Sequence, residues 1–222
     1  MVATNFDVCF DICLQWEGGY TNNPDDPGGP TNLGIIQSPE YNNYRRSKGL
    51  PLQSVRWITR EEAKDIYKNK YWDVMNCDNL PPGLDLAVFD ASVNNGTGRA
   101  HQWLDITQDI DKYCDLRLRF DQSLGHLWRV FGSGWSTRIA GIRHQAQTLA
   151  AGKQIWTAQR VQEALNKLGA SPPLVVDGVS GPATISAIRK FQATHNLTAD
   201  GIAGPQTLAV LEHAELLWVP KI

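Results

Sequence analysis

The stretch Glu17-Gly18-Gly19-Tyr20 decides the fold of the N-terminal half, together with the segment that follows it, Asp26-Pro27-Gly28-Gly29-Pro30-Thr31-Asn32-Leu33-Gly34-Ile35. Upstream, apolar residues recur at helical spacing between positions 6 and 14, and Glu17 continues their stripe. The two glycines supply the positive φ that ends a helix. We therefore expect a first helix that reaches Glu17 and aims its carboxyl at the edge of the core.

Glu17 and Asp26 are two carboxyls that we expect to lie in different surroundings and therefore to differ in protonation. Burial disfavours a charged carboxylate, so we expect a raised pKa for Glu17 and a proton available for a leaving group. Asp26 lies in a polar loop that keeps it ionised, and Thr31 is placed to orient an attacking water. Glycoside hydrolysis requires such a pair. The plainer alternative is that Glu17 extends from a helix end to water, and that Asp25 and Asp26 only make turns.

The same stretch resembles the signature of glycoside hydrolase family 108, which comprises bacterial and phage N-acetylmuramidases that cut peptidoglycan. The resemblance covers residues 17–35 and implies that Glu17 is the general acid, while Asp26 and Thr31 hold the water. Because Asp25 is adjacent to Asp26, the resemblance leaves open which of the two is the second catalytic carboxylate. The predicted substrate-binding residues are Tyr20, Asp25 and Asn32. The order of Glu, Asp and Thr is also similar to that of the phage-type lysozymes, a likeness that implies inversion at the anomeric carbon.

Composition excludes several classes of protein. The chain has 222 residues, 42% hydrophobic and 20% charged, with a net charge of −2, which argues against a nucleic-acid binder. No apolar run is long enough to span a bilayer, and the first twenty residues contain no Lys or Arg, so we expect neither a membrane helix nor a signal peptide. The four cysteines and five histidines lack ligand spacing, so no metal and no cofactor is expected. Cys9 and Cys13 are interpreted as small core residues.

The pattern beyond the motif is helical. Thr4 suggests a cap for the first helix, Leu33–Ile36 suggests part of a small hairpin, and Thr59 with Glu62 has capping-box spacing. Apolar residues at 3/4 spacing predict two long helices, one ending at Phe131 and one beginning at Trp135, with Gly132-Ser133-Gly134 between them. Four tryptophans are candidates either for the core or for stacking on a sugar: Trp72, Trp103, Trp128 and Trp135.

A repeat marks the C-terminal part. Asp177-Gly178-Val179-Ser180-Gly181-Pro182-Ala183-Thr184-Ile185 returns 23 residues later as Asp200-Gly201-Ile202-Ala203-Gly204-Pro205-Gln206-Thr207-Leu208. Each copy places a proline at the first position of a helix. The repeat resembles the three-helix peptidoglycan-binding domain. We therefore predict an all-α protein with a minor hairpin: a lysozyme-like lobe over residues 1–152 and a wall-binding module over 153–222.

The resemblances together imply a peptidoglycan hydrolase that cleaves the β-1,4 bond between N-acetylmuramic acid and N-acetylglucosamine. We expect a monomeric phage endolysin, made in the host cytoplasm and acting on the cell wall, with peptidoglycan as its partner. Two alternatives stay open at this point. A lytic transglycosylase would use Glu17 without Asp26, and a wall-binding or virion protein would use neither.

Overall fold

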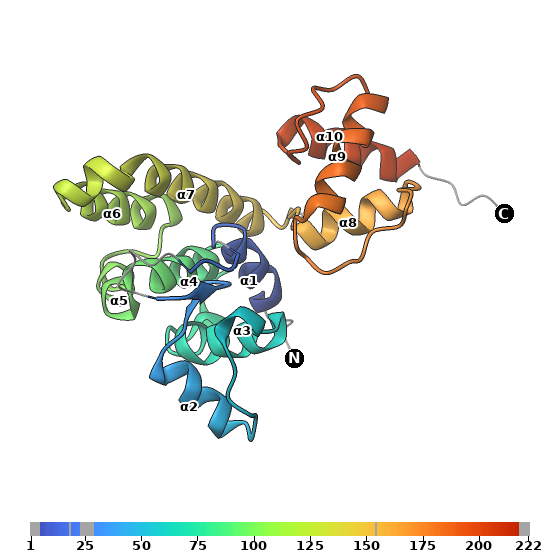
Figure 1. Cartoon of the computed structure of the whole chain (residues 1–222). Coiled ribbons are helices and arrows are strands. Elements are labelled where there is room, and N and C mark those ends of the chain that lie inside the picture. The colour runs from blue at the N-terminus through green and yellow to red at the C-terminus, as the bar shows by residue number, and fades with distance from the viewer. Residues whose placement is uncertain (1–4, 18, 23–28, 154, 218–222) are drawn as a thin grey trace. The chain divides into compact units, whose positions relative to one another are not determined.

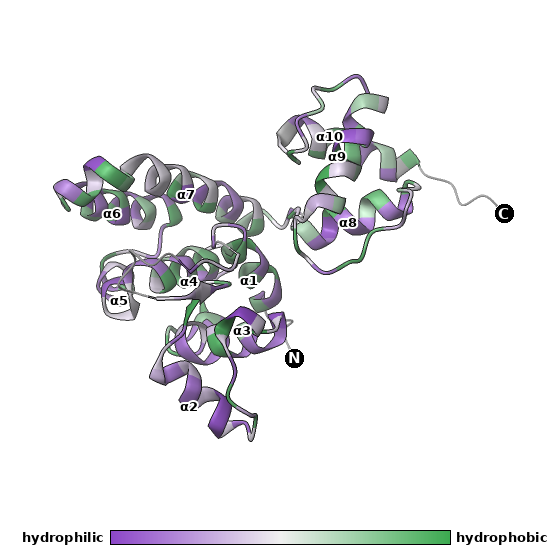
Figure 2. Cartoon of the chain, in the orientation of Figure 1, coloured by the Kyte–Doolittle hydropathy of each residue, from purple (hydrophilic) through white to green (hydrophobic). Residues whose placement is uncertain are grey.

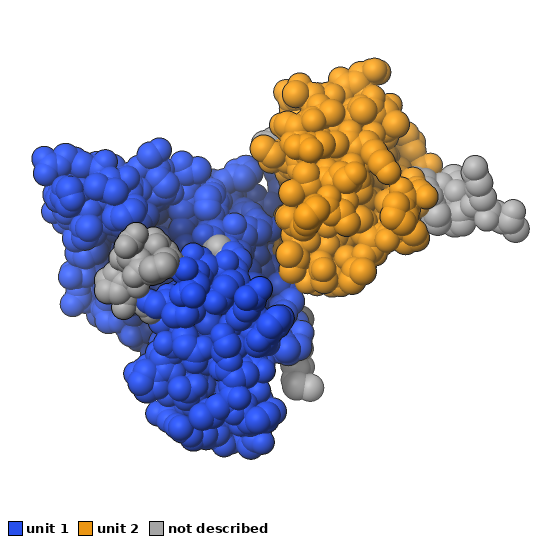
Figure 3. Space-filling model, in the orientation of Figure 1, with its two compact units in different colours: residues 1–155 blue, residues 156–222 orange. Residues whose placement is uncertain are grey.

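The computed structural model describes residues 5–17, 19–22, 29–153 and 155–217, and most of them are helical (Figure 1). The chain divides into two compact units, residues 1–155 and 156–222, which Figure 3 shows in different colours. Each unit has its own cluster of buried apolar side chains. The predicted fold class, all-α with a minor hairpin, is confirmed.

Helix α1 (Phe6–Leu14) opens the N-terminal unit and buries Phe6, Cys9, Phe10, Ile12 and Cys13. The prediction that this helix reaches Glu17 is wrong, because it ends at Leu14. The amides of Trp16 and Glu17 then donate to carbonyls only three residues back, a tighter turn than an α-helix makes. The cap predicted at Thr4 lies outside the described residues.

The predicted hairpin is present and very short. Strands β1 (Thr31–Asn32) and β2 (Ile35–Ile36) pair antiparallel, with Thr31 opposite Ile36 and Asn32 opposite Ile35. Leu33 and Gly34 both have positive φ, 50° and 73°, as a two-residue type I′ turn requires. The turn therefore carries residues 33 and 34 to the tip of the hairpin.

Short elements follow the hairpin: α2 (Pro39–Ser47), the 3₁₀ turn η1 (Val55–Trp57), α3 (Arg60–Tyr67), the π-helical turn η2 (Lys68–Trp72) and the 3₁₀ turn η3 (Cys77–Asn79). The capping box predicted for Thr59 and Glu62 is confirmed, since each side chain accepts a hydrogen bond from the other's backbone amide. Helix α2 is largely hydrophilic and stands out in Figure 2.

Helix α4 (Leu84–Asn95) forms the centre of the N-terminal unit. Every residue from Leu84 to Ser92 is buried, because the helix packs against α1, α5 (Thr97–Ile106), α6 (Ile110–Gln122) and α7 (His126–Ala150). A helix covered on all sides is normally apolar all round. Asp85 and Asp90 are exceptions and require partners. All four cysteines are free and buried, as predicted for the first two.

The predicted helix break at residues 132–134 is wrong. Helix α7 runs through these glycines, and the chain turns earlier, at Ser123–Gly125, where Gly125 has a φ of 57°. Gly132 is covered by the indole of Trp128, and a Cβ there would lie 2.6 Å from that ring. Helix propensity is a weak constraint, so a helix can continue through a glycine, and at Gly132 the indole of Trp128, one turn earlier in α7, leaves no room for a side chain.

The C-terminal unit contains helices α8 (Ala158–Lys167), α9 (Pro182–Thr194) and α10 (Pro205–Leu217). Its sequence repeat is also a structural repeat, centred on two buried glutamines. The Gln162 amide donates to the Asp177 carboxylate and the Thr184 hydroxyl, and the Gln192 amide makes the same two bonds to Asp200 and Thr207. The motif residues therefore close the two turns that precede α9 and α10.

Candidate active site around Glu17

The carboxyl of Glu17 lies at the edge of the core, and 20% of the side chain is exposed. Its Oε1 atom accepts a hydrogen bond of 2.9 Å from Nη1 of Arg138, which lies 121 residues further along the chain in α7. Arg138 is itself buried. The sequence-based expectation of a carboxyl at the core edge is therefore met, but its direct partner was not anticipated.

A buried ion network stands behind this pair. Asp90 of α4 is completely buried and binds two guanidiniums, with 2.7 Å from Oδ1 to Arg138 Nη2 and 2.6 Å from Oδ2 to Arg117 Nη1. Burial alone would raise the pKa of the Asp90 carboxyl, but the two guanidiniums outweigh burial and hold that pKa below its usual value. One carboxylate therefore faces two cations, and the Glu17 carboxyl is the second acidic group in contact with this network. The network thus ties α4 and the turn that follows α1 to α6 and α7.

The hairpin turn covers the carboxyl from its other side. Gly34 approaches so closely that a Cβ there would lie 3.1 Å from Oε2 of Glu17 and 2.1 Å from the Tyr67 hydroxyl. That hydroxyl donates to the carbonyl of Leu33 at 3.1 Å. Burial, and to a lesser extent the charge of Glu17, raise the pKa of Tyr67, so it stays a donor. One carboxylate oxygen is therefore held by Arg138, while the other faces the turn.

The other predicted site residues have mixed placements. Thr31 is half-buried in β1, and its backbone pairs with Thr21. The Asn32 amide donates to the carbonyls of residues 55 and 56, which fastens the hairpin to η1, so the structure gives this side chain a structural contact. Tyr20 is 39% exposed, with the Arg56 guanidinium 5.2 Å from its ring centre. Asp25 and Asp26 lie outside the described residues.

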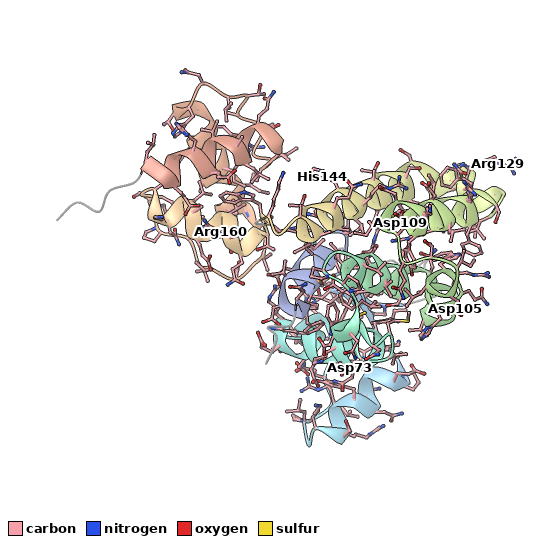
Figure 4. The ribbon with its side chains drawn as sticks, turned by 180° about the vertical axis from the view of Figure 1, so that it is seen from behind. Asp73, Asp105, Asp109, Arg129, His144 and Arg160 are labelled. Atoms are coloured by element: carbon pink, nitrogen blue, oxygen red, sulfur yellow. The ribbon has the colours of Figure 1, made fainter. Side chains whose placement is uncertain are left out.

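Two of the four tryptophans lie in the core, and the other two are half-buried. Trp72 and Trp103 are buried and belong to the core. Trp128 and Trp135 of α7 are half-buried, with ring centres 6.4 Å apart, and Phe131 packs on Trp135. Figure 4 shows Arg129 near the end of α7 where this aromatic group lies, and His144 towards its other end. Among the residues described, no three His, Cys, Asp or Glu side chains converge as metal ligands would.

Sequence reasoning did not identify Arg138, Arg117, Asp90 or Tyr67 as site residues. One signal was available for Asp90, a lone acid inside an apolar segment, because a buried charge requires an opposite charge. No pattern in the sequence points from Asp90 or Glu17 to Arg138, since helix periodicity relates only neighbours on one helix.

The fold and site define a class: a helical unit with one anchored carboxyl at the edge of its core, followed by a small helical module built from a repeat. Residues 10–96 match the family described as "Glycosyl hydrolase 108", and residues 158–211 match the family described as "Putative peptidoglycan binding domain". The chain therefore carries a glycosyl hydrolase 108 domain followed by a peptidoglycan-binding domain. It is a glycoside hydrolase that acts on peptidoglycan.

A solved structure is also similar to much of the chain. The structure of Brucella abortus SagA is similar with 29% identity and a TM-score of 0.54, over 66% of this chain and 95% of SagA. No curated protein matches the chain. In the described residues no helix is both long and apolar enough to cross a bilayer.

Proposed function

We propose that the protein is an N-acetylmuramidase that hydrolyses the β-1,4 bond between N-acetylmuramic acid and N-acetylglucosamine, with Glu17 as the general acid. The observation that carries the proposal is the position of this carboxyl. Arg138 holds Oε1, and Oε2 faces the hairpin whose strand β1 bears Thr31. A general acid must be held within hydrogen-bonding reach of the leaving-group oxygen, and this anchorage provides a fixed orientation.

The reaction proposed has two parts. Glu17 gives its proton to the glycosidic oxygen as the bond to the anomeric carbon breaks, so that the leaving sugar departs as an alcohol. A water activated by a second carboxylate, assigned to Asp26 or its neighbour Asp25, attacks the anomeric carbon from the opposite face and inverts it. Thr31 is assigned to orient that water. NMR of the first product tests the stereochemistry, and retention of the β-configuration would contradict inversion.

The ion network has a positioning role in this proposal. Asp90 binds Arg138 through both Nε and Nη2, at 3.1 and 2.7 Å, which leaves Nη1 directed at Glu17. A guanidinium is a planar fork, so its orientation on Asp90 also fixes the bond that it makes to Glu17. Arg138 and Asp90 thus act through Glu17.

The variant Glu17→Gln tests the assignment of the acid. The amide keeps the shape of the carboxyl but cannot supply the proton, so we expect activity to fall by about 10²–10⁴-fold. The assay is clearing of purified peptidoglycan, with thermal unfolding as a check of the fold. Glu61→Gln, an exposed position on α3, serves as the control. A folded Glu17→Gln protein with parental activity would rule out Glu17 as the acid.

Product analysis separates the proposal from its alternatives. Mass spectrometry of released fragments should show reducing ends, since water is the acceptor. Anhydro-sugar ends would identify a lytic transglycosylase, which needs no second carboxylate. If the wild-type protein sediments with cell walls but releases nothing, it is a wall-binding protein without catalysis.

We further propose that the protein acts as an endolysin, that is, as the enzyme that opens the host wall at the end of a phage cycle. The pairing of a hydrolase unit with a wall-binding unit fits this role. Expression in a bacterial cytoplasm, alone and together with a pore-forming holin, tests it. We expect lysis only when the holin is present. Lysis without the holin would contradict the proposal that the protein reaches the wall through a holin pore.

A further inference from the structure

A pocket of about 470 Å³ lies in the N-terminal unit between the hairpin, α2 and the π-helical turn η2. We call it the hairpin pocket. It is lined mainly by apolar and aromatic side chains, with polar groups at its edge. The residues that matter here are Ile36, Tyr44, Ile66, Asn69, Lys70 and Tyr71. A concave, mostly apolar surface with a few polar groups is the usual form of a site for a small molecule or sugar.

The hairpin pocket adjoins the Glu17 carboxyl through a single residue. Gly34 lines the pocket, and it is also the residue that approaches Oε2 of Glu17 so closely that it has no room for a side chain. The pocket and the carboxyl therefore share Gly34 as a neighbour. The ring of Tyr71, which lines the pocket, has its centre 5.6 Å from that of Tyr67, whose hydroxyl lies beside Gly34.

The backbone that builds the pocket is unusual. Helix α3 continues into a single π-helical turn over Lys68–Trp72, and this turn carries Asn69, Lys70 and Tyr71 to the pocket. Single π-helical turns are rare and occur frequently at functional sites. This observation is independent of the pocket's volume.

Lys70 is the cation of the hairpin pocket. Its side chain is exposed, its Nζ lies 5.5 Å from the centre of the Tyr71 ring, and it forms no ion pair or hydrogen bond with any described residue. By contrast, Lys68 in the same turn is paired with Asp73 at 2.5 Å; Figure 4 labels Asp73. The pocket therefore combines apolar walls with an ammonium that no described residue neutralises by direct contact.

We propose that the hairpin pocket binds the muramyl residue of the glycan strand, with Lys70 holding its acidic substituent. The proposal rests on the muramidase function above and names a determinant of its specificity. The apolar face of a sugar ring packs on aromatic and aliphatic side chains, and an ammonium binds the carboxylate of the lactyl group or of the attached peptide. N-acetylglucosamine has no such carboxylate, so Lys70 distinguishes the two sugars of the strand.

Glu40, the other charged residue of the pocket, acts in the opposite direction. It is exposed at the start of α2, and hydrogen bonds from Ser38 and from its own backbone lower its pKa. Its negative charge repels an anionic ligand and attracts Lys70. Glu40→Gln and Lys70→Met should therefore shift the affinity for an anionic glycan in opposite directions.

The test measures binding by the full chain in a Glu17→Gln background, so that no ligand is consumed. The probes are amidase-treated glycan strands, which keep the lactyl carboxylate, and oligomers of N-acetylglucosamine, which are neutral. By calorimetry, Lys70→Met should weaken binding of the strands about three- to tenfold, and reduce its salt dependence, without changing binding of the neutral oligomers. Glu40→Gln should strengthen binding of the strands. Lys68→Met, which removes a charge from the same turn outside the pocket, should change neither affinity.

Three outcomes overturn the proposal: unchanged binding of strands by Lys70→Met, an equal loss for both probes, or the same loss with Lys68→Met. The C-terminal unit is identical in all variants, so its own binding cancels in the comparison. Cleavage by the wild-type protein is measured separately. If the wild-type protein cleaves peptidoglycan but Lys70→Met does not change binding, the muramidase function stands and the role of the hairpin pocket is refuted. If Lys70→Met weakens binding but the wild-type protein does not cleave, the role of the pocket stands and the muramidase function is refuted.

Discussion

Arg138→Lys is the most informative change, because it keeps the positive charge and removes the planar guanidinium that binds two carboxyls at once. The guanidinium bonds Asp90 through Nε and Nη2 and Glu17 through Nη1. A lysine ammonium is a single point that cannot span both carboxylates. With Asp90 completely buried, we expect the ammonium to remain with Asp90 and the bond to Glu17 to be lost.

The expected magnitudes follow from these contacts. A lost hydrogen bond to a charged group costs about 1.5–3 kcal/mol, which urea unfolding measures as a lower midpoint. A carboxyl displaced by about 1 Å costs on the order of 10²-fold in rate, so kcat for peptidoglycan should fall by that factor. Arg143→Lys is the matched control, because Arg143 lies on the same helix and pairs with Asp115 at the surface. For Arg143→Lys we expect the free energy of unfolding to fall by about 1 kcal/mol or less and kcat to be unchanged.

A double-mutant cycle separates positioning from general stability. If Arg138 acts through Glu17, then Arg138→Lys should reduce activity in the parental background and have little further effect in a Glu17→Gln background. Parental kcat in Arg138→Lys, at a measurably lower stability, would refute the reasoning, since the bond would then contribute to the fold alone. Equal rate losses in both backgrounds would also refute it.

Three further predictions follow. Gly34→Ala should lower both stability and kcat, because its Cβ would collide with Tyr67. The control is Gly49→Ala, which has a similar φ of 67° and open space around it, so only the cost of a positive φ for alanine should lower its stability. Equal effects of the two variants would contradict the steric argument. Asp90→Asn should reduce the free energy of unfolding by about 3–5 kcal/mol at pH 7. Because the pKa of Asp90 is lowered in the folded protein, its carboxyl contributes stability only while it is ionised. Urea unfolding should therefore show the difference from wild type shrinking below about pH 4. Deleting residues 156–222 should leave activity on soluble glycan strands unchanged and slow the clearing of insoluble walls, since the module supplies effective concentration; equal clearing without it would make it a structural appendage.

Local structure was predictable where one short segment sufficed to determine it. The hairpin, the Thr59–Glu62 capping box and the paired turns of the C-terminal repeat all formed as predicted. Two boundaries were wrong. Glu17 follows α1 by a tight turn of three-residue hydrogen bonds, and α7 runs through Gly132, where the Trp128 indole of the same helix lies against the backbone.

The sequence by itself determined that one carboxyl lies at the edge of the N-terminal core, and that a repeat-built module follows it. Both are properties of neighbouring residues: the carboxyl closely follows a short apolar helix, and the repeat has glycines with positive φ at its turns, although Gly19 after Glu17 does not adopt the positive φ expected for it. Only the tertiary structure decided which groups surround the carboxyl. Arg138 is 121 residues from Glu17 and 48 from Asp90, and Gly34 of the hairpin turn lies beside the carboxyl. Such contacts arise from packing in three dimensions, since burying Asp90 requires cations from wherever the chain brings them.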